Sequence, residues 1–114
     1  MLLIFLASSV PGDQVPGTIS DKLAHLLVYA VLGACFMLPL SGGRGAGVTP
    51  GRAAAAVLLA VLYGVSDEVH QSFTPNRTPD PMDVVADAAG AAIGAAAVLV
   101  AALVAARFRT TRPE

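Results

Sequence analysis

The sequence predicts an all-α fold, a polytopic helical membrane bundle with three transmembrane helices and a short or truncated N-terminal one, in a single domain over residues 1–114. Of the 114 residues 55% are hydrophobic and only 13% are charged, whereas a soluble domain is about 25% charged. The mean hydropathy is +0.70. Three apolar runs approach or exceed the ~20 residues that a helix needs to cross a bilayer. Their small residues let helix backbones approach closely in lipid.

The first apolar run, MLLIFLASSV at residues 1–10, covers about half of a span. It has no positively charged start, so it fits a secretory signal peptide poorly. It is a half-span, a re-entrant piece packed against the bundle, or a first helix whose upstream part is missing from this chain, and we favour the last. A loop punctuated by proline and glycine follows at residues 11–20.

The second run, residues 23–40, is long enough to span. Ser20 is the predicted N-cap, and Asp21 is favourably placed against the helix dipole. Lys22, His25 and Tyr29 follow at spacings of four or less, so they share one face near the start of the helix. Pro39 and the glycine-rich loop after it end the run. The single cysteine, Cys35, excludes an internal disulfide and is predicted to be a small buried hydrophobe.

The third run, residues 53–73, is apolar until Ser66 and then strongly polar. A helix places Tyr63, Asp67, His70 and Gln71 on one face, with Glu68 flanking it. Pro75 ends the helix, since proline cannot continue its hydrogen-bond ladder. This run therefore carries a polar group at its C-terminal end.

The fourth run, residues 84–106, is preceded by its own start signals. Asp80 is the predicted N-cap and Pro81 the first helical residue. The stripe that follows combines acidic residues and glycines at spacings of four, three and four: Asp83, Asp87, Gly90 and Gly94. Because these positions share a narrow arc, the stripe is predicted to face protein rather than lipid.

The basic residues predict the orientation. Arg44 and Arg52 lie in the second loop and three arginines in the tail, two segments that lie on the same side because two crossings separate them. Basic loops are enriched on the cytoplasmic side, so the C-terminus is predicted to be cytoplasmic. The polar ends of the second, third and fourth runs then meet at the outward-facing side of the membrane. A net charge of -1 supplies no basic footprint for nucleic acid.

The segments SDKLAHLLVYAVLG and LYGVSDEVHQSFTPNRTPDPMDVVADAAG resemble the VanZ-like family of small bacterial membrane proteins with about four spans. The family pattern is Asp-Lys-x-x-His, then Asp-Glu-x-x-Gln, then Pro-x-Arg and a helix-opening Asp. In this sequence it matches, in order, Asp21, Lys22, His25, Asp67, Glu68, Gln71, Pro75, Arg77 and Asp83. The chain departs from the family in its short first run, and at Asp87, where many members carry Asn.

The resemblance implies a multi-pass protein of the bacterial cytoplasmic membrane that acts on or near a cell-envelope component. The family is named for a factor associated with resistance to teicoplanin. We expect the lipid bilayer and a lipid-linked envelope or glycopeptide-related ligand as partners, and a homo-oligomer stays open. Three functions compete: a membrane-embedded transferase or hydrolase, a non-catalytic envelope factor, and an ion path.

The candidate site residues divide into two groups. Asp67, Glu68 and His25 are the candidate acid–base groups, and the same carboxylates could instead pair with Arg77 or Lys22 as structural ion pairs. The candidate substrate-binding residues are Lys22, Gln71, Arg77, Asp83 and Asp87. The sequence contains no strong metal-ligand spacing and no cofactor motif, so it predicts neither a metal nor a cofactor.

Overall fold

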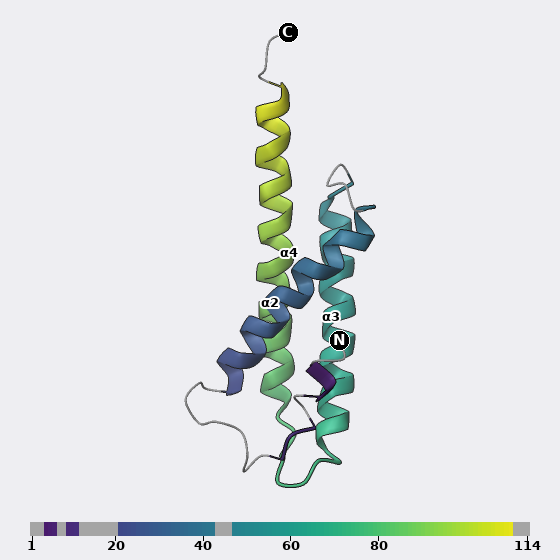
Figure 1. Ribbon diagram of the computed structural model, residues 1–114, viewed down its shortest axis with the longest axis vertical. Helices are drawn as coiled ribbons and strands as arrows, with labels where there is room; N and C mark the ends of the chain where they lie inside the picture. The colour runs from purple at the N-terminus through teal and green to yellow at the C-terminus, as the bar shows by residue number, and fades with distance from the viewer. Residues whose placement is uncertain (1–3, 7–8, 12–20, 43–46, 111–114) are drawn as a thin grey trace.

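The computed structural model describes residues 4–6, 9–11, 21–42 and 47–110. Three helices account for most of them: α2 (Asp21–Leu40), α3 (Pro50–Gln71) and α4 (Pro81–Thr110). Each is long and apolar enough to cross a membrane, which confirms the three predicted spans. Residues 4–6 form a short helical piece that lies beside the lower half of α3 (Figure 1). The predicted N-cap Ser20, Arg44 and the tail beyond Thr110 lie outside the described residues.

The helix ends differ slightly from the predicted runs, and local hydrogen bonds explain why. α3 begins at Pro50 rather than at residue 53, because the Thr49 side chain accepts a hydrogen bond from the Arg52 backbone N–H at 3.3 Å and so caps the helix. α4 begins as predicted: the Asp80 carboxylate accepts from the Met82 N–H at 2.9 Å, and Pro81 is the first helical residue.

The helices pack through small residues, as the glycine stripe predicts. α2 crosses α4 diagonally (Figure 1), and a Cβ atom added at Gly90 or Gly94 would overlap the backbone carbonyl of Leu26 or Ala30 on α2. Because only glycine allows so close an approach, the α2–α4 contact is a backbone-to-backbone contact of the kind that stabilises helix pairs in lipid.

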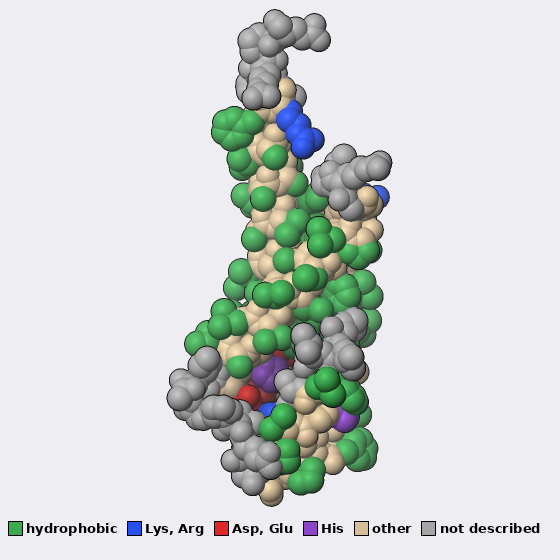
Figure 2. Space-filling view, viewed as in Figure 1, with side chains coloured by type: hydrophobic (Ala, Val, Ile, Leu, Met, Phe, Trp, Pro, Cys, Tyr) green, Lys and Arg blue, Asp and Glu red, His purple; other side chains and the backbone are tan. Residues whose placement is uncertain are grey.

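The core between the helices is thin. One buried group comprises Tyr29, Leu32, Ala60 and Ala91, and a second comprises Met37, Ala56 and Ala95. Large apolar side chains instead cover the outside of the bundle (Figure 2). This distribution is the inverse of that in a soluble bundle and fits a lipid environment. The expectation that Cys35 is buried was wrong, since it lies on the exposed side of α2.

Candidate functional site

The starts of α2 and α4 and the end of α3 meet at one end of the bundle (Figure 1). Figure 2 shows acidic, basic and histidine side chains gathered in a hollow at this end, with hydrophobic side chains above it. We call this group the polar cluster. Its members are Lys22, His25, Asp67, Glu68, Gln71, Asp80, Asp83 and Asp87. The described ends of α3 and α4 at the opposite side carry the basic residues Arg52, Arg107 and Arg109 instead.

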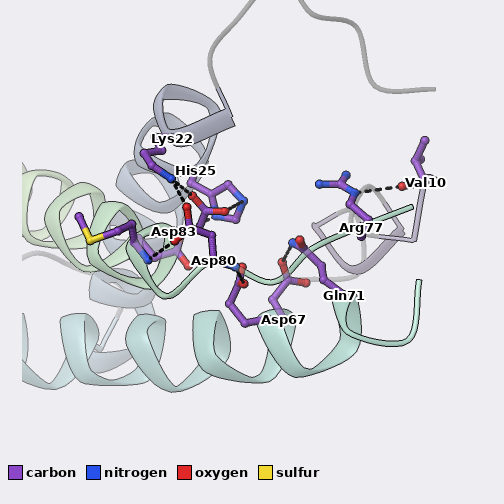
Figure 3. A network of polar contacts seen from close by, with 11 residues as sticks. Val10, Lys22, His25, Asp67, Gln71, Arg77, Asp80 and Asp83 are labelled. Atoms are coloured by element: carbon purple, nitrogen blue, oxygen red, sulfur yellow. Dashed lines mark hydrogen bonds and ion pairs between the residues drawn. The ribbon is translucent and has the colours of Figure 1, made fainter. Parts of the chain in front are cut away.

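Lys22 joins α2 to the start of α4. Its ammonium group donates to Asp80 at 2.5 Å and to Asp83 at 3.1 Å (Figure 3). Asp83 is only 3% exposed, whereas Lys22 and Asp80 are each about half exposed. The hydrogen bond from Lys22, helped by the Met82 N–H, lowers the pKa of the Asp80 carboxyl. Lys22 therefore pairs with the carboxylates of α4, and not with those of α3 that the sequence offered as partners.

His25 and Asp87 form a second link between α2 and α4. The imidazole Nδ1 lies 2.8 Å from Asp87 Oδ1, and Nε2 lies 4.0 Å from Asp83 Oδ2. When Asp87 is ionised it only accepts hydrogen bonds, so Nδ1 is the donor, and a neutral imidazole then has its lone pair on Nε2. Asp87 is fully buried, and its second oxygen, Oδ2, has no hydrogen-bond partner among the described residues. This arrangement orients an imidazole for accepting a proton or a ligand.

The end of α3 contributes two buried carboxylates in different settings. Asp67 accepts a hydrogen bond from the Gln71 amide at 3.1 Å, one turn along the same helix. Glu68 reaches across to α4, where one oxygen accepts from the Asp80 backbone N–H at 2.9 Å. Its other oxygen, Oε1, is buried without a hydrogen-bond partner in the described part of the chain. Glu68 thus lies inside the polar cluster.

Arg77 and His70 lie apart from the other candidates. The Arg77 Nε donates to the Val10 carbonyl at 3.2 Å (Figure 3). The His70 ring stacks on Phe5 with centroids 4.2 Å apart, and its Nε2 lies 2.9 Å from the Ser9 hydroxyl. Both residues therefore hold the described N-terminal piece against the end of α3. The described hydrogen bond of Arg77 is therefore to a backbone carbonyl rather than to a carboxylate of α3.

Two residues of the site were not singled out from the sequence. Tyr29, which the sequence places on one face with Lys22 and His25 without a role in the site, is 1% exposed, and its hydroxyl has no hydrogen-bond partner among the described residues. Its position four residues after His25 was the available signal, and the two rings stack with centroids 6.2 Å apart. Gly64 packs on the Asp87 carboxylate, since an added Cβ would lie 2.5 Å from Oδ2. Helix periodicity alone cannot reveal that contact, because it joins two helices.

Three metal-ligating side chains also meet at this end. Ligand atoms of Asp21, His25 and Asp83 all lie within 4.8 Å of one another. Asp21 and His25 are one turn apart on α2, and Asp83 comes from the first turn of α4. Chemically, the polar cluster offers an oriented imidazole, several carboxylates and one ammonium group, a set suited to proton transfer or to binding a polar ligand.

The comparisons with known proteins point to one family. A family model described as VanZ/LLP1 matches residues 1–104, a range that includes every member of the polar cluster. The search of curated proteins found no match, and neither did the search of solved structures.

Proposed function

The chain belongs to the VanZ-like family of membrane proteins, and on this basis we propose that the polar cluster is a working site at the outer face of the bacterial cytoplasmic membrane, acting on or near a cell-envelope component. The family name further suggests a part in resistance to teicoplanin-type glycopeptides. These drugs act outside the cytoplasmic membrane, on the side where the proposed orientation puts the polar cluster.

The observation that carries this proposal is the burial of four carboxylates in an otherwise apolar bundle. Of the described residues, Asp67, Glu68, Asp83 and Asp87 are all at most 8% exposed. An acidic side chain costs ~2.5–3.5 kcal/mol at the centre of a membrane helix on insertion scales, and near a helix end its burial among apolar side chains is still unfavourable. A chain keeps several such groups at one level most readily when they do something that apolar residues cannot do.

The orientation rests on the charge distribution along the described helices. Arg52 opens α3, and Arg107 and Arg109 lie in the last turn of α4, at the end away from the polar cluster. Since basic residues concentrate on the cytoplasmic side, we assign this end and the C-terminus to the cytoplasm. The polar cluster then faces outward, toward the envelope.

For the site itself we propose acid–base chemistry on a lipid-linked or glycopeptide-related envelope ligand. His25 would transfer the proton, with Asp87 fixing its tautomer, and Glu68 would act as the second carboxylate beside Asp67. Lys22 would bind an anionic group of the ligand, with Gln71 and Asp83 offering further polar contacts. Arg77, the remaining candidate for substrate binding, lies apart from them and contacts the N-terminal piece instead. A transferase or a hydrolase would use these groups in the same way.

A non-catalytic envelope factor is the second candidate, and the interhelical contacts favour it. Lys22–Asp83 and His25–Asp87 tie α2 to α4, and Glu68 ties α3 to α4. Such links would hold the bundle together even if no reaction took place. On this alternative, removing one acidic group lowers the amount of folded protein in the membrane, and any loss of protection follows that amount.

The experiment compares teicoplanin susceptibility in a Gram-positive host that expresses the wild type, Glu68→Gln or His25→Gln at matched membrane abundance. His70→Gln is the matched control, because it changes the chain's other histidine, which contacts the N-terminal piece instead. We expect protection from the wild type and the control, and none from the two site variants. Equal protection by all four proteins would refute a working role for the polar cluster.

A further inference from the structure

We propose that Asp21, His25 and Asp83 form a binding site for a divalent transition-metal ion, with Zn²⁺ as the reference ligand. The proposal concerns the protein itself and does not depend on the envelope role. It also goes beyond the sequence analysis, which predicts no metal site. The ligands come from two helices, 58 residues apart along the chain from His25 to Asp83, and only the α2–α4 packing joins them.

The donor atoms suit such an ion. One nitrogen and two carboxylates form a donor set of the kind that zinc and related ions accept, with Zn–N and Zn–O distances of about 2.0–2.2 Å. Two ligands of one ion therefore lie up to about 4 Å apart. His25 Nε2 and Asp83 Oδ2 are 4.0 Å apart, and all three ligand atoms lie within 4.8 Å of one another. A small side-chain adjustment at the exposed Asp21 closes the set.

The neighbouring contacts prepare these atoms for a metal. Nδ1 of His25 lies 2.8 Å from Asp87 Oδ1, and a neutral imidazole that donates from Nδ1 has its lone pair on Nε2. A carboxylate behind a histidine ligand is the usual way in which proteins fix its tautomer and orientation. Lys22 binds Asp83 through Oδ1 at 3.1 Å, so Oδ2 remains available on the side of the imidazole. His25 Nε2 and Asp83 Oδ2 are therefore both free of the contacts that their partner atoms make.

A separate observation points to a cation at this place. Glu68 is 8% exposed and projects from α3 to the start of α4, where Oε2 bonds to the Asp80 N–H. Its buried Oε1 has no hydrogen-bond partner among the described residues, and it lies within electrostatic reach of Asp83 and His25. Burial close to Asp83 makes a negative charge on Glu68 costly, and a cation bound nearby would offset that cost. Among the described residues, the ion pairs give these carboxylates one basic side chain, Lys22, which contacts Asp80 and Asp83.

The test uses the full chain in nanodiscs, without a polyhistidine tag and with Cys35→Ser to remove the thiol. After stripping with EDTA, Zn²⁺ is titrated against a chromophoric chelator, and Ca²⁺ is titrated in parallel. We expect one Zn²⁺ per chain and much weaker Ca²⁺ binding, because imidazole favours transition metals. Asp21→Asn should weaken Zn²⁺ binding at least about tenfold, since even outer-shell changes cost about 10–100-fold.

Two variants keep the result decisive. Asp21 is exposed, so Asp21→Asn leaves the buried contacts intact and the protein folded, which circular dichroism and gel filtration check. His25→Gln should abolish binding, and His70→Gln should leave it unchanged. The proposal is overturned if the wild type binds no Zn²⁺, if Asp21→Asn binds as the wild type does, or if His70→Gln loses binding as His25→Gln does. Because no envelope component is present, none of these outcomes bears on the teicoplanin assay.

Discussion

The close contact between α2 and α4 gives the most direct test of the fold, through Gly94→Ala. A Cβ at this position would overlap the Ala30 carbonyl oxygen and lie 2.7 Å from the Ala30 carbonyl carbon, whereas ordinary contacts begin at 3.4 Å. The carbonyl oxygen lies closer still, so the two helices must separate by more than the ~0.7 Å that the carbon requires. The obstacle is backbone, so no side-chain rotation can relieve it.

Overpacking of this kind costs about 1–3 kcal/mol, which changes the folding equilibrium about 5- to 150-fold at ~1.4 kcal/mol per factor of ten. Alanine also gains about 0.5–1 kcal/mol over glycine inside a helix. Gly51→Ala serves as the matched control, because a Cβ there meets only the Thr49 hydroxyl at 4.0 Å. The difference between the two variants largely removes the propensity effect and leaves the overpacking.

The assay is SDS titration in mixed micelles, followed by the near-ultraviolet circular dichroism of the tyrosines, of which Tyr29 is buried at the α2–α4 contact. We expect Gly94→Ala to unfold at a lower SDS concentration than Gly51→Ala, because its free energy of unfolding is lower by about 1–3 kcal/mol. The same separation would lengthen the 2.8 Å His25–Asp87 hydrogen bond, so protection against teicoplanin should also fall. If Gly94→Ala is as stable as Gly51→Ala, the helices do not approach as described and the reasoning fails.

Three further predictions follow from the same geometry. Gly64→Ala places a Cβ 2.5 Å from Oδ2 of Asp87, so it should displace this carboxylate and shift the imidazole NMR signals of His25 in protein that still inserts. Unchanged imidazole signals would contradict the contact. Lys22→Met leaves the Asp83 carboxylate, which is 3% exposed, without its ammonium partner. It should therefore lower the SDS concentration at the unfolding midpoint more than Lys22→Arg does, and equal midpoints would refute the pairing. With Cys35→Ser as background, a membrane-impermeant maleimide should label Thr78→Cys in intact cells and Gly51→Cys only after lysis; the reverse pattern would overturn the proposed orientation.

The labelling positions show how the structure sharpens a sequence prediction. Ser41 lies in the loop after α2 and would be a natural choice from the sequence. It is 7% exposed, however, and its hydroxyl is buried, so a cysteine there would react slowly on either side of the membrane. Gly51 and Thr78 are exposed and report topology without this ambiguity.

The elements of the fold were predictable because each depends on local sequence. Apolar length defines the three spans, Asp80 and Pro81 define the start of α4, and the four-residue spacing of Gly90 and Gly94 identifies the face that packs. The start of α3 was predicted three residues late, because the Thr49 cap is polar and lies before the apolar run. Local chemistry accounts for that difference as well.

The sequence by itself determined that this protein is an α-helical membrane bundle of the VanZ-like type, with its polar residues at the ends of three helices, because length, hydropathy and motif order are properties of the linear chain. It also identified His25, Glu68 and Asp83 as candidate site residues. Only the tertiary structure decided which partners the charged side chains have. Lys22 pairs with Asp83 and not with the carboxylates of α3, and Arg77 donates to a backbone carbonyl. The reason is geometric. Helix periodicity fixes which residues share a face, whereas pairing between helices depends on the crossing that the glycines of α4 permit.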